Sequence, residues 1–122
     1  MASLNRVQLI GRLGKEPETK KAPNDRTVCT FSLAVDRRWK DKAGVVKKET
    51  DWFNIEAWGK TAEFCEKYLH KGELVFLEGK LRTQKYESNG ENRIVTKVML
   101  DQIQLFEWRG EETELDVVEE IE

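Results

Sequence analysis

Residues 51–58 read DWFNIEAW, and their side chains alternate between two kinds. Successive side chains of an extended strand point to opposite faces. One face is apolar and consists of Phe53, Ile55 and Ala57. The other face consists of Trp52, Asn54, Glu56 and Trp58. The segment therefore predicts a half-buried strand whose solvent face holds two large rings, roughly 20 Å apart along the strand.

Four other segments predict strands: LNRVQLIGRL (4–13), TVCTFSLAV (27–35), ELVFLEGKLRTQKYE (73–87) and RIVTKVMLDQIQLFE (93–107). An Asn-Gly turn signal at Asn89 joins the last two. Residues 14–26 and 36–50 are charged or contain Pro and Gly, and they predict connections. A helix is predicted after Trp58 from an apolar stripe, with Thr61 as its cap and Gly72 as its stop. The stripe consists of Phe64, Cys65, Tyr68 and Leu69.

The order strand-strand-strand-helix-strand-strand is that of an OB-fold, a five-stranded Greek-key barrel. The predicted class is therefore all-β with one helix. A ferredoxin-like domain would need a helix between its first two strands, and residues 15–26 are a poor helix. We expect one domain over residues 1–106 and an acidic, disordered tail over 107–122.

Charge is divided unevenly along the 122 residues. The net charge is −2, but residues 107–122 hold eight acids against Arg109, which leaves a net of +5 on residues 1–106. A basic body favours a polyanionic ligand, and an acidic tail indicates a separate role for that segment.

Several classes of protein lack support in this sequence. No apolar run approaches the roughly 20 residues of a membrane span, and the N-terminus has no signal-peptide pattern, so we expect no membrane partner and a cytoplasmic, nucleoid-associated location. Cys29 and Cys65 lie in apolar patterns, which predicts buried free thiols. A single histidine and no cysteine pair predict no metal site, and no nucleophile, phosphate-loop or dinucleotide motif predicts an enzyme or a cofactor.

Aromatic and basic residues occur together at several points. The loop around Trp39 reads RRWKDK, and the even positions from 78 to 86 form a polar, mainly basic face that ends in Tyr86. Bases of a single strand stack on flat rings while cations follow the phosphates, a combination that tolerates any base sequence. The pattern favours single-stranded nucleic acid over duplex, whose base faces are hidden.

Each aromatic has an alternative role. Trp52 and Trp58 could lie at a subunit interface, where aromatics are enriched. Trp39 could pack on its own loop, and Tyr86 could be a cross-strand packing residue. The corresponding alternative functions are an OB-fold protein-interaction or primosomal accessory domain, and an RNA binder; a nuclease is a more distant possibility.

Residues 1–106 resemble the bacterial-type single-stranded DNA-binding proteins (SSB). The resemblance rests on NRVQLIGRLGKEPE, FSLAV, TDWFNIEAWGK and AEFCEKYLHKGELVFLEGKLRTQKYE. It implies sequence-independent binding and protection of single-stranded DNA in replication, recombination and repair. In that family aromatics stack on bases, and the matching positions are Trp39, Trp52, Trp58 and Tyr86. The matching phosphate-contacting positions are Arg6, Lys42, Lys60, Lys71, Arg82 and Lys85.

The resemblance also implies an assembly and protein partners. The family is usually a homotetramer, so we expect at least a homodimer; Phe53 matches a position at a subunit contact that is often His. Replication and repair proteins bind the acidic tip of such proteins. The matching tip here is Glu119, Glu120, Ile121 and Glu122. It differs from the family pattern because the Gly/Pro-rich linker and the closing Pro-Phe are missing.

Overall fold

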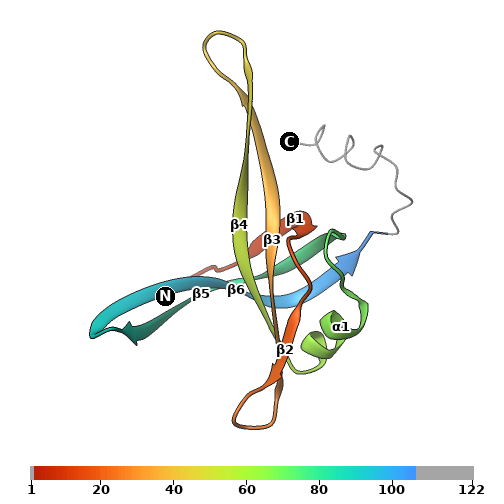
Figure 1. Cartoon of the computed structure of the whole chain (residues 1–122), viewed down its shortest axis with the longest axis vertical. Coiled ribbons are helices and arrows are strands. Elements are labelled where there is room, and N and C mark those ends of the chain that lie inside the picture. Colours follow the sequence, from red (N-terminus) through yellow and green to blue (C-terminus); the bar gives the residue numbers. More distant parts are fainter. Residues whose placement is uncertain (1, 107–122) are drawn as a thin grey trace.

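In the computed structural model, which describes residues 2–106, the chain forms six strands and one helix. The strands are β1 (Val7–Leu13), β2 (Glu18–Lys21), β3 (Thr27–Lys40), β4 (Val46–Trp58), β5 (Leu74–Ser88) and β6 (Glu91–Leu105). The helix α1 (Lys60–Tyr68) lies between β4 and β5. Figure 1 shows two long hairpins, β3–β4 and β5–β6, that project from a small body in different directions.

The strands form one sheet in the order β1-β5-β6-β4-β3-β2, and an additional pairing between β1 and β3 closes it. Neighbours in the barrel are antiparallel except β4 and β6, which are parallel. The closing contact pairs Arg12 with Ala34 and Leu13 with Leu33. This confirms the predicted OB-fold, with the helix between the third and fourth of its five barrel strands; β2 is an extra short strand paired with β3.

The inward faces of the barrel strands and the inner side of α1 form one hydrophobic core. Its fully buried members include Leu33, Ile55, Leu77 and Leu69 of the helix end. Cys29 and Cys65 are both buried and free, as predicted. The hydrogen bond between these thiols and their burial raise the pKa of Cys65 above its ordinary range, so this thiol stays protonated at neutral pH.

A bulge in β6 adapts this strand to the barrel. Glu78 pairs with Gln102 while the next β5 residue, Gly79, pairs with Leu100, so Asp101 is an extra residue of β6. The alternation of β5 is therefore unbroken, as predicted, but that of β6 changes. Two sets of β6 residues face the core: Val98 and Leu100 before the bulge, and Ile103 and Leu105 after it.

Two expectations about the connections were wrong. Residues 36–50 are mostly strand, because β3 and β4 stay paired as far as Lys40 and Val46 around a short turn. Residues 18–21, ETKK, pair with β3 and are not loop. Leu81 continues the odd-numbered row of Val75 and Leu77 but is 47% exposed, because it lies beyond Gly79, the last β5 residue that pairs with β1.

The ends of the helix also differ from expectation. The N-cap is Gly59 at φ 62°, with no side-chain cap, so Thr61 lies inside the first turn and does not cap it. The helix ends at Tyr68, whereas Gly72 adopts φ +88° in the turn that follows. A left-handed glycine therefore serves the turn into β5 and not the helix terminus.

Candidate nucleic-acid interface

The outward side of β4 carries the polar row that the sequence indicates, which we call the aromatic face: Trp52, Asn54, Glu56 and Trp58. The register with β3 places this row beside outward residues of the neighbouring strand, with Trp52 opposite Ala34 and Trp58 opposite Val28. Trp52 is 60% exposed, whereas Trp58 is half-buried. The prediction that both rings share one face is therefore confirmed.

The ring of Trp52 packs against the backbone at the end of β1. A β-carbon built at Gly14 would lie 2.4 Å from Cζ3 of Trp52 and 3.0 Å from Oγ of Ser32. The absence of a side chain at position 14 therefore leaves the space that the indole occupies. With 60% of its surface exposed, the residue remains largely open to solvent, as a stacking platform requires.

Trp58 is held by two neighbours. Its indole Nε1–H donates to Oε2 of Glu56 at 2.8 Å, and the guanidinium carbon of Arg26 lies 5.2 Å from its ring centroid. Glu56 is buried and accepts a second contact from Nζ of Lys97 on β6, at 3.2 Å. A β-carbon at Gly59 would come only into van der Waals contact with this guanidinium, 3.4 Å from Nη2 of Arg26.

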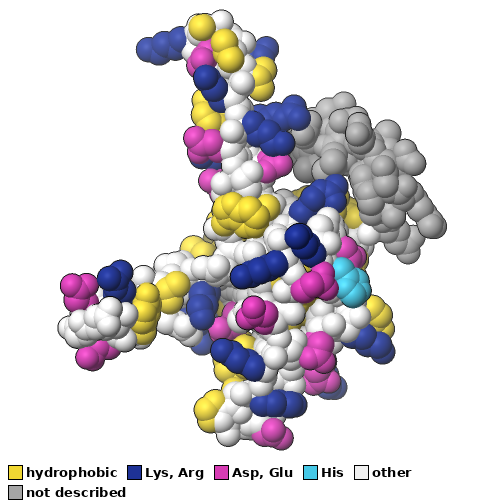
Figure 2. Space-filling model, in the orientation of Figure 1, with side chains coloured by type: hydrophobic (Ala, Val, Ile, Leu, Met, Phe, Trp, Pro, Cys, Tyr) yellow, Lys and Arg dark blue, Asp and Glu magenta, His cyan; other side chains and the backbone are white. Residues whose placement is uncertain are grey.

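The β5–β6 hairpin continues the same surface away from the barrel. Its unbroken alternation puts Lys80, Arg82 and Tyr86 on one side, and the register sets Arg82 beside Lys97. A hollow of about 640 Å³ opens on this hairpin, lined by Gln84, Lys85, Tyr86, Val95 and Lys97. Figure 2 shows hydrophobic side chains exposed at the base of the β3–β4 hairpin, with basic side chains beside them.

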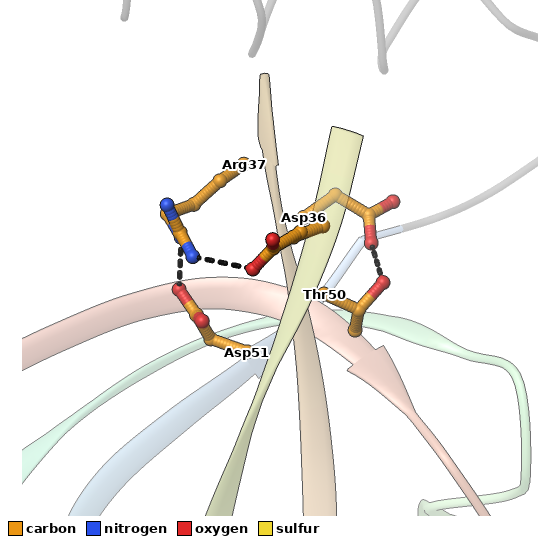
Figure 3. A network of polar contacts seen from close by, with 5 residues as sticks. Asp36, Arg37, Thr50 and Asp51 are labelled. Carbon is orange, nitrogen blue, oxygen red and sulfur yellow. Dashed lines mark hydrogen bonds and ion pairs between the residues drawn. The ribbon is translucent and has the colours of Figure 1, made fainter. Parts of the chain in front are cut away.

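Trp39 lies on the β3–β4 hairpin but on its other side. In the register, Trp52 shares a face with Ala34, and Trp39, paired with Lys47, belongs to the alternate row. Arg37 of that row donates Nε to Asp51 at 2.8 Å and Nη2 to Glu49 at 2.9 Å, while its guanidinium carbon lies 5.2 Å from the Trp39 ring centroid. In Figure 3 the bond from Thr50 to Asp36 lies apart from this Arg37 network.

The remaining predicted cations lie at separate places. Arg6 precedes β1 and approaches Glu78 of β5 at 3.6 Å. Lys42 is exposed in the turn of the β3–β4 hairpin, and Lys60 opens α1 two residues after Trp58. Lys71 lines a second hollow of about 600 Å³ with Arg12, Gly72, Glu73, Leu74 and Phe106.

The expected tip Glu119, Glu120, Ile121 and Glu122 lies outside the described residues. Between residues 2 and 106, no group of three or more His, Cys, Asp or Glu side chains could hold a metal ion. No helix in that same range is long and apolar enough to cross a membrane.

Four residues of this surface were missed by sequence reasoning. Glu56 was noted only as a polar strand residue, although its spacing of two from Trp58 permits a contact along one face. Arg26 and Gly14 reach the tryptophans through strand pairing, and Lys97 reaches Glu56 across the parallel pair β4–β6. None of these three gives a local sequence signal.

Comparison with known proteins adds an independent observation. Residues 4–106 match the family model described as the single-strand binding protein family. A protein of Neisseria meningitidis named single-stranded DNA-binding protein is 40% identical over 110 residues, which cover 89% of this chain and 63% of that protein. Single-stranded DNA-binding protein 2 of Streptococcus agalactiae is 40% identical over 107 residues, covering 88% of this chain and 80% of that one. The chain therefore spans less than two thirds of the Neisseria relative.

Solved structures of single-stranded DNA-binding proteins are also similar to this chain. A Plasmodium falciparum SSB in complex with single-stranded DNA superimposes with a TM-score of 0.81 at 33% identity, covering 88% of this chain and 98% of that one. A deletion mutant of the single-stranded DNA binding protein from Thermus aquaticus gives a TM-score of 0.79 at 30% identity, with 88% and 52% of the two chains covered.

Proposed function

Because this chain belongs to the single-strand binding protein family, we propose that it binds single-stranded DNA without regard to base sequence. The observation that carries the proposal is the aromatic face of β4, which exposes Trp52 and holds Trp58 against Arg26 and Glu56, with Lys97 bonded to the same Glu56. Rings supply surfaces on which any base can stack, and the basic β5–β6 hairpin lies alongside for the phosphates. The match of residues 4–106 to this family confirms the resemblance to SSB proteins that the sequence shows.

The proposed mechanism has two parts. Bases unstack from each other and stack on Trp52, Trp58 and Tyr86, while Arg82, Lys85 and Lys97 neutralise phosphates and release counterions. No bond is made or broken, so the protein acts by binding and not as an enzyme. Its role would be to cover and protect single strands that arise in replication, recombination and repair.

The test is a titration of tryptophan fluorescence with poly(dT), with duplex DNA and with matched poly(rU), at low and high salt. Strong quenching by poly(dT) alone supports the proposal, because stacking on a base quenches the indole. Equal response to poly(rU) would favour an RNA binder. No quenching of the folded protein would favour the interaction-domain alternative.

We infer that the protein acts as a homotetramer, or at least a homodimer. The support is the outer edge of β1: in residues 2–106, β1 pairs with β5 over Val7–Arg12 but meets β3 only at Arg12 and Leu13. The backbone groups of a strand edge can pair with a second copy. Sedimentation equilibrium tests this inference, and a monomer at micromolar concentration would contradict it.

We also propose that the acidic tail recruits replication and repair proteins, and that the protein resides in the cytoplasm with the nucleoid. The support for the tail is its charge, eight acids with interspersed apolar residues over 107–122. A pull-down from host lysate with and without residues 111–122 is the test. Identical recovery of partners would contradict this proposal without affecting DNA binding.

A further inference from the structure

A buried carboxylate lies in the middle of the surface that we propose for a polyanion. Glu56 is 6% exposed and occupies the aromatic face between Asn54 and Trp58. An acid at this place opposes the approach of phosphates, since like charges repel. Neither the hydrophobic core nor the closure of the barrel requires it, because its side chain points to the outward side of β4 with Trp52 and Trp58.

Both oxygens of this carboxylate have partners in the described chain. Oε2 accepts from the indole Nε1–H of Trp58 at 2.8 Å, and Oε1 accepts from Nζ of Lys97 at 3.2 Å. The side chain of Lys97 is 29% exposed, so its ammonium is held at the rim of the surface. One carboxylate thus joins a ring of β4 to a cation of β6.

The ring of Trp58 is constrained from two directions. Glu56 holds its Nε1 edge, and Arg26 lies over its ring at 5.2 Å from the centroid. An indole that can donate to one fixed acceptor loses most of its freedom to rotate. Side chains that are ordered before binding lose less conformational entropy when the ligand arrives.

We propose that Glu56 is a positioning residue that fixes the ring plane of Trp58 and the ammonium of Lys97 before a single strand binds. This inference rests on the proposed function, because it assigns Glu56 a role in stacking. The negative charge is compensated by Lys97, and the hydrogen bond to the ring outweighs the remaining repulsion of phosphates. Glu56 itself need not touch the nucleic acid.

A purely electrostatic role of Glu56 predicts the opposite result. If Glu56 only repels phosphates, every substitution that removes its charge should tighten binding, and Gln and Val should behave alike. The positioning role separates the two substitutions, because the Gln side-chain oxygen still accepts from Trp58 whereas Val cannot. Val is also well suited to a strand, and Lys97 can extend into solvent, so the Val variant should fold.

The experiment measures binding of poly(dT) by the parent, Glu56→Gln, Glu56→Val and the control Glu66→Gln, which removes one charge from the exposed side of α1. We expect Glu56→Gln and Glu66→Gln to bind within about twofold of the parent, and Glu56→Val to bind at least about fivefold more weakly, as loss of an ordered stacking ring implies. Equal affinity of Glu56→Gln and Glu56→Val overturns the inference. A parent that does not bind poly(dT) overturns the proposed function and this inference together.

A measurement on the free protein is independent of how the Val variant folds. Indole N–H resonances are assigned with Trp→Phe variants, and their exchange with solvent is compared. We expect the Trp58 indole hydrogen to exchange at least about tenfold more slowly than that of exposed Trp52, since a hydrogen bond protects it. Glu56→Gln should keep this protection and Glu56→Val should lose it. Equal exchange of Trp58 and Trp52 in the parent overturns the inference.

Discussion

The ring of Trp52 lies against the backbone of Gly14, so close that a β-carbon at position 14 would stand 2.4 Å from Cζ3 of the indole. Gly14→Ala should therefore displace this ring and weaken poly(dT) binding about five- to tenfold, at the low end of the range for losing one stacked base. Stability should change by less than ~1 kcal/mol, because an exposed ring can swing into solvent. In a Trp52→Ala background, Gly14→Ala should have no effect on binding. Weaker binding in that background would mean that the substitution acts by distorting the backbone and not by displacing the ring.

Rings and cations should differ in the way salt affects their contributions. Trp52→Ala and Trp58→Ala should each weaken binding by ~1–3 kcal/mol, the range typical of OB-folds that bind single strands, with little change in the salt slope. Arg82→Ala should flatten the plot of log K against log salt by about 0.7, since one phosphate is no longer neutralised. The measurement is a fluorescence titration at several salt concentrations. Parent-like binding by both tryptophan variants would refute stacking.

Trp39 occupies the row of the β3–β4 hairpin opposite to that of Trp52, so a short strand on the aromatic face should not reach it. Trp39→Ala should weaken binding of poly(dT) but leave binding of an oligonucleotide of about eight nucleotides nearly unchanged, given site sizes of ~4–16 nucleotides for one OB-fold. Trp52→Ala is the matched comparison and should weaken both. If Trp39→Ala weakened binding of poly(dT) and of the short oligonucleotide equally, a short strand would contact both Trp39 and Trp52, which would contradict this prediction.

Gly79 makes room for the β6 bulge. A β-carbon at this position would lie 2.2 Å from the backbone oxygen of Met99, which cannot move without breaking the β5–β6 ladder. Gly79→Ala should lower the free energy of unfolding by ~2–3 kcal/mol, as overpacking of a close backbone contact does. Urea unfolding measures this, with the exposed neighbour Lys80→Ala as control, expected within ~0.5 kcal/mol of the parent. An unchanged midpoint for Gly79→Ala would contradict the contact.

The pKa of Glu16 should lie below the ordinary value of a glutamate. Its carboxylate accepts the backbone N–H of Lys71 and faces Nδ1 of His70 at 3.2 Å, and these contacts lower its pKa from 4.5. A carboxyl group whose pKa falls on folding stabilises the fold above its unfolded pKa, and this stabilisation is lost as the pH drops through the folded value. NMR titration of the side-chain carboxyl carbon should give a midpoint below 4.5, and a midpoint at or above 4.5 would refute the contact.

The sequence predicts most of the barrel because the alternation of buried and exposed side chains is local. The prediction is wrong at residues 36–50, because a two-stranded hairpin outside the barrel has no face that packs on the core. Its charged residues therefore show no alternation of apolar and polar side chains. The same reason explains exposed Leu81, whose apolar side chain fits a core pattern on a strand that has already left the core. The four polar or charged residues of β2 are recognisable only through their pairing with β3.

For the candidate surface too, the sequence predicts which residues of one strand share a face but not which residues of different strands are in contact. The shared face of Trp52 and Trp58 follows from their even spacing, and the basic row of β5 follows from its unbroken alternation. The contacts of Gly14 with Trp52 and of Lys97 with Glu56 depend on which strands pair and in what register. That information is set by packing of the whole barrel and not by any one segment.

Asp101 determines which residues face the core in the two halves of β6. Before this extra residue Val98 faces the core and Lys97 faces the outward surface, and after it Ile103 takes the inward place. Deleting Asp101 would place Gln102 directly after Leu100, which removes the bulge and keeps Val98 on the core face and Lys97 on the outward face. Loss of this one codon would therefore straighten β6 without exchanging its two faces.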